Sequence, residues 1–126
     1  MNSIYSFKTS NLAGEIVVPS DKSISHRALI IGSTVNGKVT INNLLESEDV
    51  IATLNALRAL GIKINKISDK WEIFGNGVGS LTLSGKTLDM GNSGTGARLL
   101  MGLVAGSNIE ATFIGDNSLS KRPMKR

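Results

Sequence analysis

The stretch PSDKSISHRALII, residues 19–31, carries the strongest fold signal in the chain. Ser23 is predicted to cap a helix over residues 23–33, because its side-chain oxygen can accept a backbone N–H group that a helix start leaves unpaired. Lys22 lies just outside that start and Arg27 lies one turn in. The helix end itself carries about half a positive charge. The stretch therefore predicts a site for a multiply charged anion, although a capped helix with two solvated cations explains it equally well.

The sequence on either side of this helix predicts strands. Residues 4–18 are predicted to be extended and to end in a short strand, because Pro19 disfavours helix at the residue before it. After the helix, the Asn-Gly pair at 36–37 predicts a turn, and residues 38–41 alternate between polar and apolar as a strand does. The helix is apolar nearly all round after Arg27, which predicts burial on every side.

The next segment, residues 47–60, predicts an amphipathic helix at a surface. Ser47 is its predicted N-cap, and two acidic residues follow in the first turn, where they favour the helix dipole. Leucines then recur at helical spacing along one stripe, and Gly61 provides the stop. Three more strands are predicted over residues 62–67, 71–74 and 81–83. The glycine-rich loop at 75–79 is predicted to be a turn rather than a phosphate loop, because no helix follows it.

A second turn of small residues, GNSGTGAR at 91–98, opens another helix that is predicted to be buried all round. Its glycines would let the backbone come close to a ligand, although a turn needed only for tight packing is the alternative. Arg98 lies near the helix start, and a strand is predicted over residues 109–114. Because this order of elements repeats the one after Arg27, the two helices are predicted to lie parallel, with both N-termini at one end of the domain.

Composition limits the classes of function. The 126 residues include no cysteine and one histidine, so thiolate chemistry is excluded and a metal site is not expected. No apolar run approaches the length of a membrane span or a signal peptide, so a cytoplasmic location is expected. The net charge of +4 includes a basic cluster at residues 121–126, which fits small anionic substrates or nucleic acid. Few aromatic residues could stack on bases, and none lies near this cluster.

Four motifs resemble those of the 3-phosphoshikimate 1-carboxyvinyltransferases, or EPSP synthases. They are KSISHRA at 22–28, LLESED at 44–49, GNSGT at 91–95 and SLSKRPM at 118–124. The resemblance implies transfer of the enolpyruvyl group from phosphoenolpyruvate to the 5-hydroxyl of shikimate 3-phosphate, with release of phosphate. This is a step of the shikimate pathway of aromatic amino-acid biosynthesis, and the resemblance implies no cofactor.

The resemblance also implies a fold and a domain organisation. The family has two lobes, each an inside-out α/β barrel of βαβαββ units with parallel helices inside and sheets outside. Residues 1–19 would be a strand segment of the opposite lobe, and residues 20–126 would be the first unit and part of the second unit of the N-terminal lobe. The family's chain is much longer, and its carboxylate catalysts would follow Arg126. We therefore expect an N-terminal fragment that is inactive alone, whose full-length form is a cytoplasmic monomer that binds neither nucleic acid nor membrane.

Residue roles follow from the resemblance, position by position. Lys22, Ser23 and Arg27 match residues that hold shikimate 3-phosphate. Lys22 also matches a residue that touches phosphoenolpyruvate, and it is the candidate catalytic group, for proton transfer or for charge stabilisation.

Four further positions match residues of the phosphoenolpyruvate site. Gly94 and Arg122 match residues at that site, and Asn92 and Thr95 match its lining. An arginine can grip phosphate or carboxylate with two parallel bonds, which a lysine cannot do. The herbicide glyphosate competes at this site in the family, and a glycine at position 94 accompanies sensitivity to it.

Two alternatives remain. The sister enolpyruvyl transferase that acts on UDP-N-acetylglucosamine usually has Lys-Asn where this chain has Lys22-Ser23. It also usually has a cysteine where this chain has Asn117, so both positions count against it. A nucleic-acid-binding module that uses residues 121–126 is the other alternative, and a steep salt dependence of duplex binding would support it.

Overall fold

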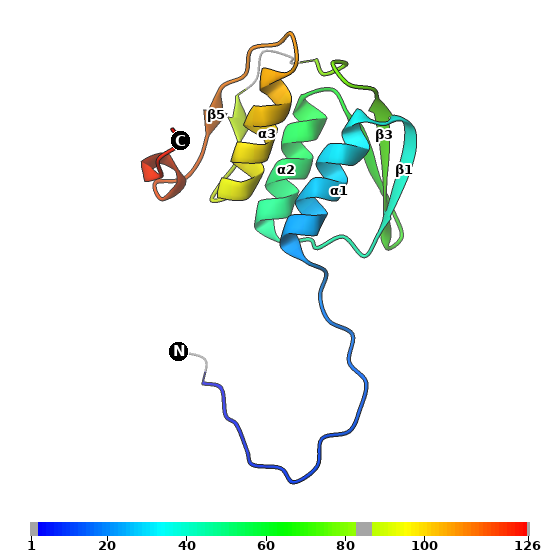
Figure 1. The fold of residues 1–126 in the computed structure, drawn as a ribbon, viewed down its shortest axis with the longest axis vertical. Helices are drawn as coiled ribbons and strands as arrows, with labels where there is room; N and C mark the ends of the chain where they lie inside the picture. Colours follow the sequence, from blue (N-terminus) through cyan, green and yellow to red (C-terminus); the bar gives the residue numbers. More distant parts are fainter. Residues whose placement is uncertain (1–2, 83–86, 126) are drawn as a thin grey trace.

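A computed structural model of the protein describes residues 3–82 and 87–125. Three helices alternate with short strands along the chain (Figure 1). In chain order the elements are α1 Lys22–Thr34, β1 Asn36–Asn42, α2 Glu48–Ala59, β2 Lys63–Ile67, β3 Lys70–Asn76, β4 Leu88–Asp89, α3 Gly94–Ala105, β5 Phe113–Ile114 and the 3-10 turn η1 Leu119–Lys121.

The helices α1, α2 and α3 form one layer and run in the same direction (Figure 1). Their N-termini all lie at the lower end of the layer in that view, and α2 lies between the other two. An antiparallel sheet of order β1-β3-β2 flanks α1, and the short parallel pair β4-β5 flanks α3. The predicted parallel arrangement of the first and last helices is confirmed, and it gathers three positive helix ends at one end of the domain.

The core lies between the helices and the three-stranded sheet. Leu29 of α1, Leu57 of α2, Ile73 of β3 and Leu100 of α3 are each 0% exposed. The predicted stripe of α2 is buried from Val50 to Leu60, whereas its polar face is exposed, as expected for an amphipathic helix. α2 thereby packs against both α1 and α3.

The cap of α1 differs from the prediction. Asp21 is the N-cap, and its Oδ1 accepts the Ile24 N–H at 2.7 Å, so α1 begins at Lys22 and Ser23 lies inside its first turn. Both residue types cap helices well, and the carbonyl of Asp21 also accepts the Ser25 hydroxyl at 2.8 Å. The predicted N-cap, Ser23, was therefore wrong by two residues. Lys22 lies within the helix rather than outside it.

Burial of the first and third helices on every side was also a wrong prediction for this chain. Ile24 and Ile31 of α1 are each 60% exposed, and Leu99 of α3 is 37% exposed. These side chains lie on faces that α2 and the sheet do not cover. Both helices therefore carry apolar side chains that no described residue covers.

The strand predictions succeeded in part. The strands predicted near residues 38–41, 62–67 and 71–74 are confirmed as β1, β2 and β3, although the expected turn at 36–37 lies in the first residues of β1. Residues 81–82 form no strand, and the rest of that prediction lies outside the described residues. The strand predicted over 109–114 is reduced to β5.

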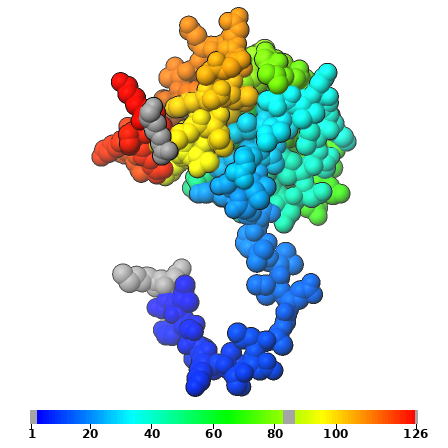
Figure 2. All heavy atoms as spheres, in the orientation of Figure 1, coloured from blue at the N-terminus to red at the C-terminus, as the bar shows by residue number. Residues whose placement is uncertain are grey.

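Residues 3–20 form an arm that leaves the body of the domain (Figures 1 and 2). No helix or strand is formed there, and its large apolar side chains from Ile4 to Val18 are 66% exposed or more. The strand predicted to end before Pro19 is therefore not formed, because nothing in the described chain pairs with it. Ser20 is where the arm rejoins the body, as its hydroxyl donates to the Asn43 carbonyl.

No helix in the described ranges is long and apolar enough to cross a membrane. Within the same ranges, no three His, Asp or Glu side chains are grouped so that they could hold a metal ion.

Candidate functional site

The start of α1 presents a lysine that is paired with α2. Lys22 Nζ lies 2.8 Å from Asp49 Oδ2, and the two side chains are 52% and 27% exposed. Asp49 lies in the first turn of α2, where a carboxylate also favours the helix dipole. Because both groups reach solvent, this ion pair is weak, and the ammonium group can leave it for another anion.

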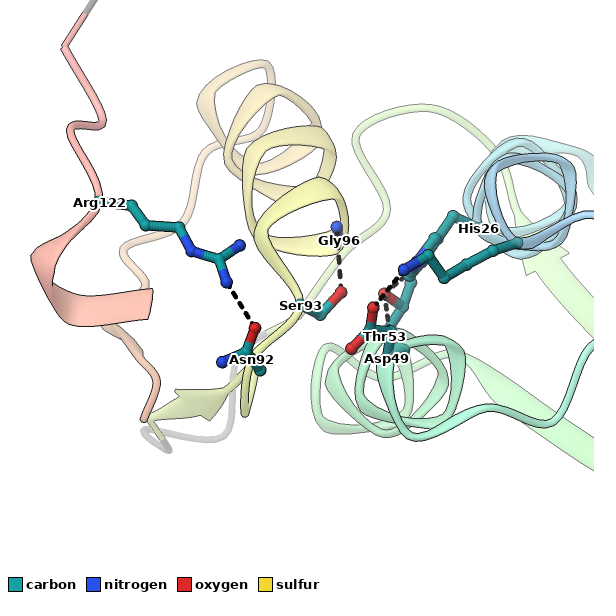
Figure 3. A network of polar contacts seen from close by, with 8 residues as sticks. His26, Asp49, Thr53, Asn92, Ser93, Gly96 and Arg122 are labelled. Atoms are coloured by element: carbon teal, nitrogen blue, oxygen red, sulfur yellow. Dashed lines mark hydrogen bonds and ion pairs between the residues drawn. The ribbon is translucent and has the colours of Figure 1, made fainter. Parts of the chain in front are cut away.

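A buried polar contact ties α1 to α2 one turn behind this lysine. His26 is 0% exposed, and its Nδ1 lies 2.9 Å from Thr53 Oγ1 (Figure 3). Burial lowers the pKa of His26, the Asp49 carboxylate opposes that shift, and Lys22 adds to it. The neutral ring therefore serves as a fixed contact between two helix starts.

The start of α3 packs closely against α2. Ser93 caps the helix by accepting the Gly96 N–H at 3.2 Å. A Cβ at position 96 would collide with Thr53 Oγ1, and it would lie 2.6 Å from Ser93 Oγ. Glycine at this position lets α2 and α3 approach each other. Thr53 of α2 therefore contacts His26 of α1 on one side and lies next to Gly96 of α3 on the other.

Two arginines converge on Gly94, the first residue of α3. A Cβ at position 94 would lie 2.8 Å from Arg122 Nη1 and 3.3 Å from Arg98 Nη1. Arg98 Nη2 donates to the Pro123 carbonyl at 3.1 Å, which holds the segment after η1 against α3. Two guanidinium groups therefore lie at a positive helix end, an arrangement suited to an anion with more than one charge.

Arg122 is held by an amide rather than by a carboxylate (Figure 3). Its Nη2 donates to Asn92 Oδ1 at 2.5 Å and to Ser118 Oγ at 3.4 Å. Asn92 Nδ2 in turn donates to Asp116 Oδ2 at 2.6 Å. The Asn92 amide, together with a Leu119 N–H bond, holds the pKa of the Asp116 carboxyl below its usual value.

Comparison with known proteins identifies the family. Residues 7–126 match the family model described as EPSP synthase (3-phosphoshikimate 1-carboxyvinyltransferase). The chain belongs to the EPSP synthase family. It is 54% identical over 123 residues to a 3-phosphoshikimate 1-carboxyvinyltransferase of Bartonella tribocorum, a match that covers 98% of this chain and 28% of the relative. It is 58% identical over 116 residues to that of Parvibaculum lavamentivorans, covering 91% of this chain and 26% of the relative.

Solved EPSP synthases share the fold. The chain superimposes on EPSP synthase from Acinetobacter baumannii with a TM-score of 0.82 and 41% identity, over 88% of this chain and 26% of that one. The predicted α/β lobe of the EPSP synthase family, incomplete in this chain, is therefore confirmed. The chain spans about a quarter of the length of the curated relatives that it matches.

The structure brings the residues matched to EPSP synthase into two groups. Asn92, Gly94 and Arg122 form one contiguous group at the start of α3, where Gly94 is buried and the other two are exposed. Thr95 is exposed in the first turn of the same helix.

The second group lies at the start of α1. Lys22 and Arg27 are exposed there, and Ser23 is half-buried. Both groups lie at the same end of the helix layer (Figure 1), but no hydrogen bond or ion pair joins them within the described ranges.

Two carboxylates in this site of the EPSP synthase fold were not predicted as functional. Asp49 was expected only to favour the dipole of the helix in whose first turn it lies, and no role was expected for Asp116. The partners of both lie more than twenty residues away, Lys22 for Asp49 and Asn92 for Asp116, so no local spacing indicates the contacts. One signal was present, since Asp116 lies three residues before Leu119 and can cap the turn that carries Arg122.

Proposed function

We propose that the protein containing this chain transfers the enolpyruvyl group of phosphoenolpyruvate to the 5-hydroxyl of shikimate 3-phosphate and releases phosphate. The observation that carries the proposal is the convergence of Arg122 and Arg98 on Gly94, at a helix N-terminus of an EPSP synthase fold. Both substrates carry a phosphate and a carboxylate. Gathering so much negative charge costs heavily unless fixed cations and N–H donors replace water.

Phosphoenolpyruvate is assigned to the start of α3. A Cβ at position 94 would lie 2.8 Å from Arg122 Nη1, so glycine there lets the guanidinium approach the positive end of α3, and both could act on the same anion. Asn92 and Thr95 complete the lining of this subsite. An arginine suits it because the planar fork can bind two oxygens of one phosphate or carboxylate.

Shikimate 3-phosphate is assigned to the start of α1, with Lys22, Ser23 and Arg27 as its ligands. Lys22 is also assigned to catalysis, since its ammonium group can leave the exposed pair with Asp49 and follow the substrates. Near the reacting carbons it would stabilise charge in the tetrahedral adduct or transfer a proton. No cofactor is required by this chemistry.

The remaining assignments extend to the whole protein. The C-terminal lobe would complete the site, residues 1–19 would join that opposite lobe, and residues 20–126 would form the first unit and part of the second. Full-length protein would act as a cytoplasmic monomer that glyphosate inhibits, and this chain alone would be inactive.

Phosphate release by the full-length protein tests the proposal. Release is expected only when phosphoenolpyruvate and shikimate 3-phosphate are both present. The Lys22→Met variant should lose most of this activity, whereas Lys121→Ala, which removes an exposed cation of the neighbouring turn, should keep it. Absence of release with both substrates, or full activity of Lys22→Met, would reject the assignment.

A further inference from the structure

We propose that Asp116 is a positioning residue for Arg122, which it orients through the side-chain amide of Asn92 and through the backbone of the turn that carries the arginine. The inference rests on the proposed function for its kinetic consequence, because Arg122 is there the ligand of phosphoenolpyruvate. The geometry itself does not depend on that function. Asp116 would make no contact with substrate.

The two carboxylate oxygens of Asp116 serve two different elements. Oδ2 accepts from Asn92 Nδ2 at 2.6 Å, and Oδ1 accepts from the Leu119 N–H at 2.7 Å. The Asp116 carbonyl also accepts the Ser120 N–H at 2.9 Å, and its own N–H donates to the Gly91 carbonyl at 2.8 Å. One residue therefore fixes both the amide that contacts Arg122 and the turn from which Arg122 extends.

The polarity of the Asn92 amide follows from these partners. Arg122 has only donors, so the group facing it must be the amide oxygen, and the NH₂ group must then face an acceptor. An ionised carboxylate at Asp116 satisfies that demand, and the bond from Asn92 lowers the pKa of Asp116, which favours the ionised form further. An amide at position 116 could not accept from Leu119 and from Asn92 at once through its two terminal atoms.

The interposed amide leaves the charge of Arg122 available. In the described part of the chain, Arg122 forms no ion pair with a carboxylate, whereas Lys22 pairs directly with Asp49. A carboxylate in direct contact would hold the guanidinium equally well but would compete with an incoming phosphate or carboxylate. The contact through Asn92 therefore orients Arg122 while it keeps the carboxylate of Asp116 out of direct contact with the guanidinium.

Four variants of the full-length protein, one of them a control, test whether Asp116 acts on Arg122 by orienting it or through its charge. In Asp116→Asn, the new amide keeps the Leu119 bond and presents NH₂ to the NH₂ of Asn92, which forces Asn92 to rotate away from Arg122. The KM for phosphoenolpyruvate should rise about tenfold, since a charge-assisted bond is lost, while the KM for shikimate 3-phosphate changes less than about twofold. Asp69→Asn, an exposed carboxylate between β2 and β3, is the matched control and should change neither.

The double variant Asn92→Asp with Asp116→Asn provides the decisive readout. It restores the hydrogen-bond pattern, with a carboxylate placed directly on Arg122. The melting temperature, which the lost bond lowers in Asp116→Asn, should therefore return towards that of the wild type. The KM for phosphoenolpyruvate should stay as high as in Asp116→Asn. The single variant Asn92→Asp should show the same raised KM. Recovery of KM in the double variant, no recovery of its melting temperature, or an unchanged KM in Asp116→Asn would overturn the proposal.

A crystal structure of the Asp116→Asn protein separates this inference from the proposed function. The Arg122 guanidinium should no longer lie within hydrogen-bond distance of residue 92, whether or not the wild type releases phosphate. An Arg122 that stays in place would overturn the positioning role even in an active enzyme. Conversely, a displaced Arg122 in a protein without transferase activity would reject the proposed function alone.

Discussion

The starts of α1 and α3 hold their cations in different ways. At α1, Lys22 lies 2.8 Å from the carboxylate of Asp49 and is half exposed. At α3, Arg122 contacts the amide oxygen of Asn92 at 2.5 Å, and the carboxylate of Asp116 lies behind that amide. Both arrangements use one aspartate, yet only the first places it against the cation.

This difference leaves the Lys22 side chain free to move and holds the Arg122 side chain in one orientation. A single exposed ion pair has a net stability of about 0–1 kcal/mol, so Lys22 can exchange Asp49 for a substrate anion at little cost. Arg122 donates hydrogen bonds to Asn92 and Ser118 through Nη2 and pairs with no carboxylate in the part of the chain that the structure describes, so it can meet an anion without first leaving a carboxylate. This contrast agrees with the proposed roles, in which Lys22 takes part in catalysis and Arg122 binds phosphoenolpyruvate.

The largest effect is expected for Arg122→Ala. Each charge-assisted bond to phosphoenolpyruvate contributes about 1.5–3 kcal/mol, so kcat/KM for that substrate should fall tenfold or more. Arg122→Lys should recover only part of this loss, since a lysine cannot make the paired bonds of the guanidinium. Steady-state kinetics of the full-length protein measure both variants. An unchanged KM and kcat in Arg122→Ala would remove Arg122 from the site.

The next largest effect is expected for Gly94→Ala, which fills the space next to the Arg122 guanidinium. In Gly94→Ala the new Cβ would lie 2.8 Å from Arg122 Nη1, so the end of the Arg122 side chain has to shift while the helix stays intact. We expect a severalfold rise in the KM for phosphoenolpyruvate and reduced inhibition by glyphosate, with stability changed by less than about 1 kcal/mol. Gly102→Ala is the matched control on the same helix, because nothing lies within 4 Å of a Cβ there. Equal KM values for the two variants would contradict the close contact at Gly94.

A third prediction concerns glyphosate and the unsubstituted protein. Because position 94 is glycine, glyphosate should inhibit the full-length enzyme in competition with phosphoenolpyruvate. Inhibition constants measured at several phosphoenolpyruvate concentrations check this. Insensitivity would show that neighbours such as Gly96 and Ala97 shape this subsite more than Gly94 does.

A pH effect on stability is expected from the contact behind Lys22. Burial lowers the pKa of His26, so the unfolded chain binds this proton more readily than the folded one. The free energy of unfolding should therefore fall as the pH drops below about 6.5 towards the lowered pKa of the folded state. Urea unfolding at pH 7.5 and 5.5 measures the difference.

Two variants locate the source of that pH dependence. His26→Gln should reduce it, whereas Thr53→Val should keep it while losing about 1 kcal/mol for the missing hydrogen bond. A pH dependence that is the same in His26→Gln and the wild type would assign it to other groups.

The smallest effect is expected for Asp49→Asn. The exposed pair with Lys22 stabilises the fold by about 1 kcal/mol or less, and kinetic constants should change only a few-fold. Chemical unfolding and steady-state kinetics give both values. A loss as large as that of Arg122→Ala would mean that Asp49 positions Lys22 as strictly as Asp116 positions Arg122.

The sequence predicted those elements that depend on interactions between residues close together in the chain. The apolar stripe from Val50 to Leu60 indicates a half-buried helix whatever its neighbours, and α2 has that form. Asp21 and Ser23 are both good caps, so sequence alone could not choose between them. The strand expected before Pro19 depends on a partner that no local pattern provides, and it is not formed.

The sequence predicted which cations belong to the candidate site but not the hydrogen bonds that orient them. Helix starts rich in glycine and basic residues point to anions, and the motifs identified the family. The bonds that orient Arg122 run from its guanidinium to Asn92, before α3, and from Asn92 to Asp116, after β5, and only the folded chain brings these residues together. Because such contacts arise from tertiary structure, residue spacing along the chain does not reveal them.

The most direct measurement is a crystal structure of the full-length protein with shikimate 3-phosphate and phosphoenolpyruvate bound. The account predicts that Arg122 and Lys22 both lie within hydrogen-bond distance of the same phosphoenolpyruvate molecule, with Arg122 still on Asn92 and Lys22 released from Asp49. Phosphoenolpyruvate bound away from the start of α3, with neither cation in contact, would contradict it.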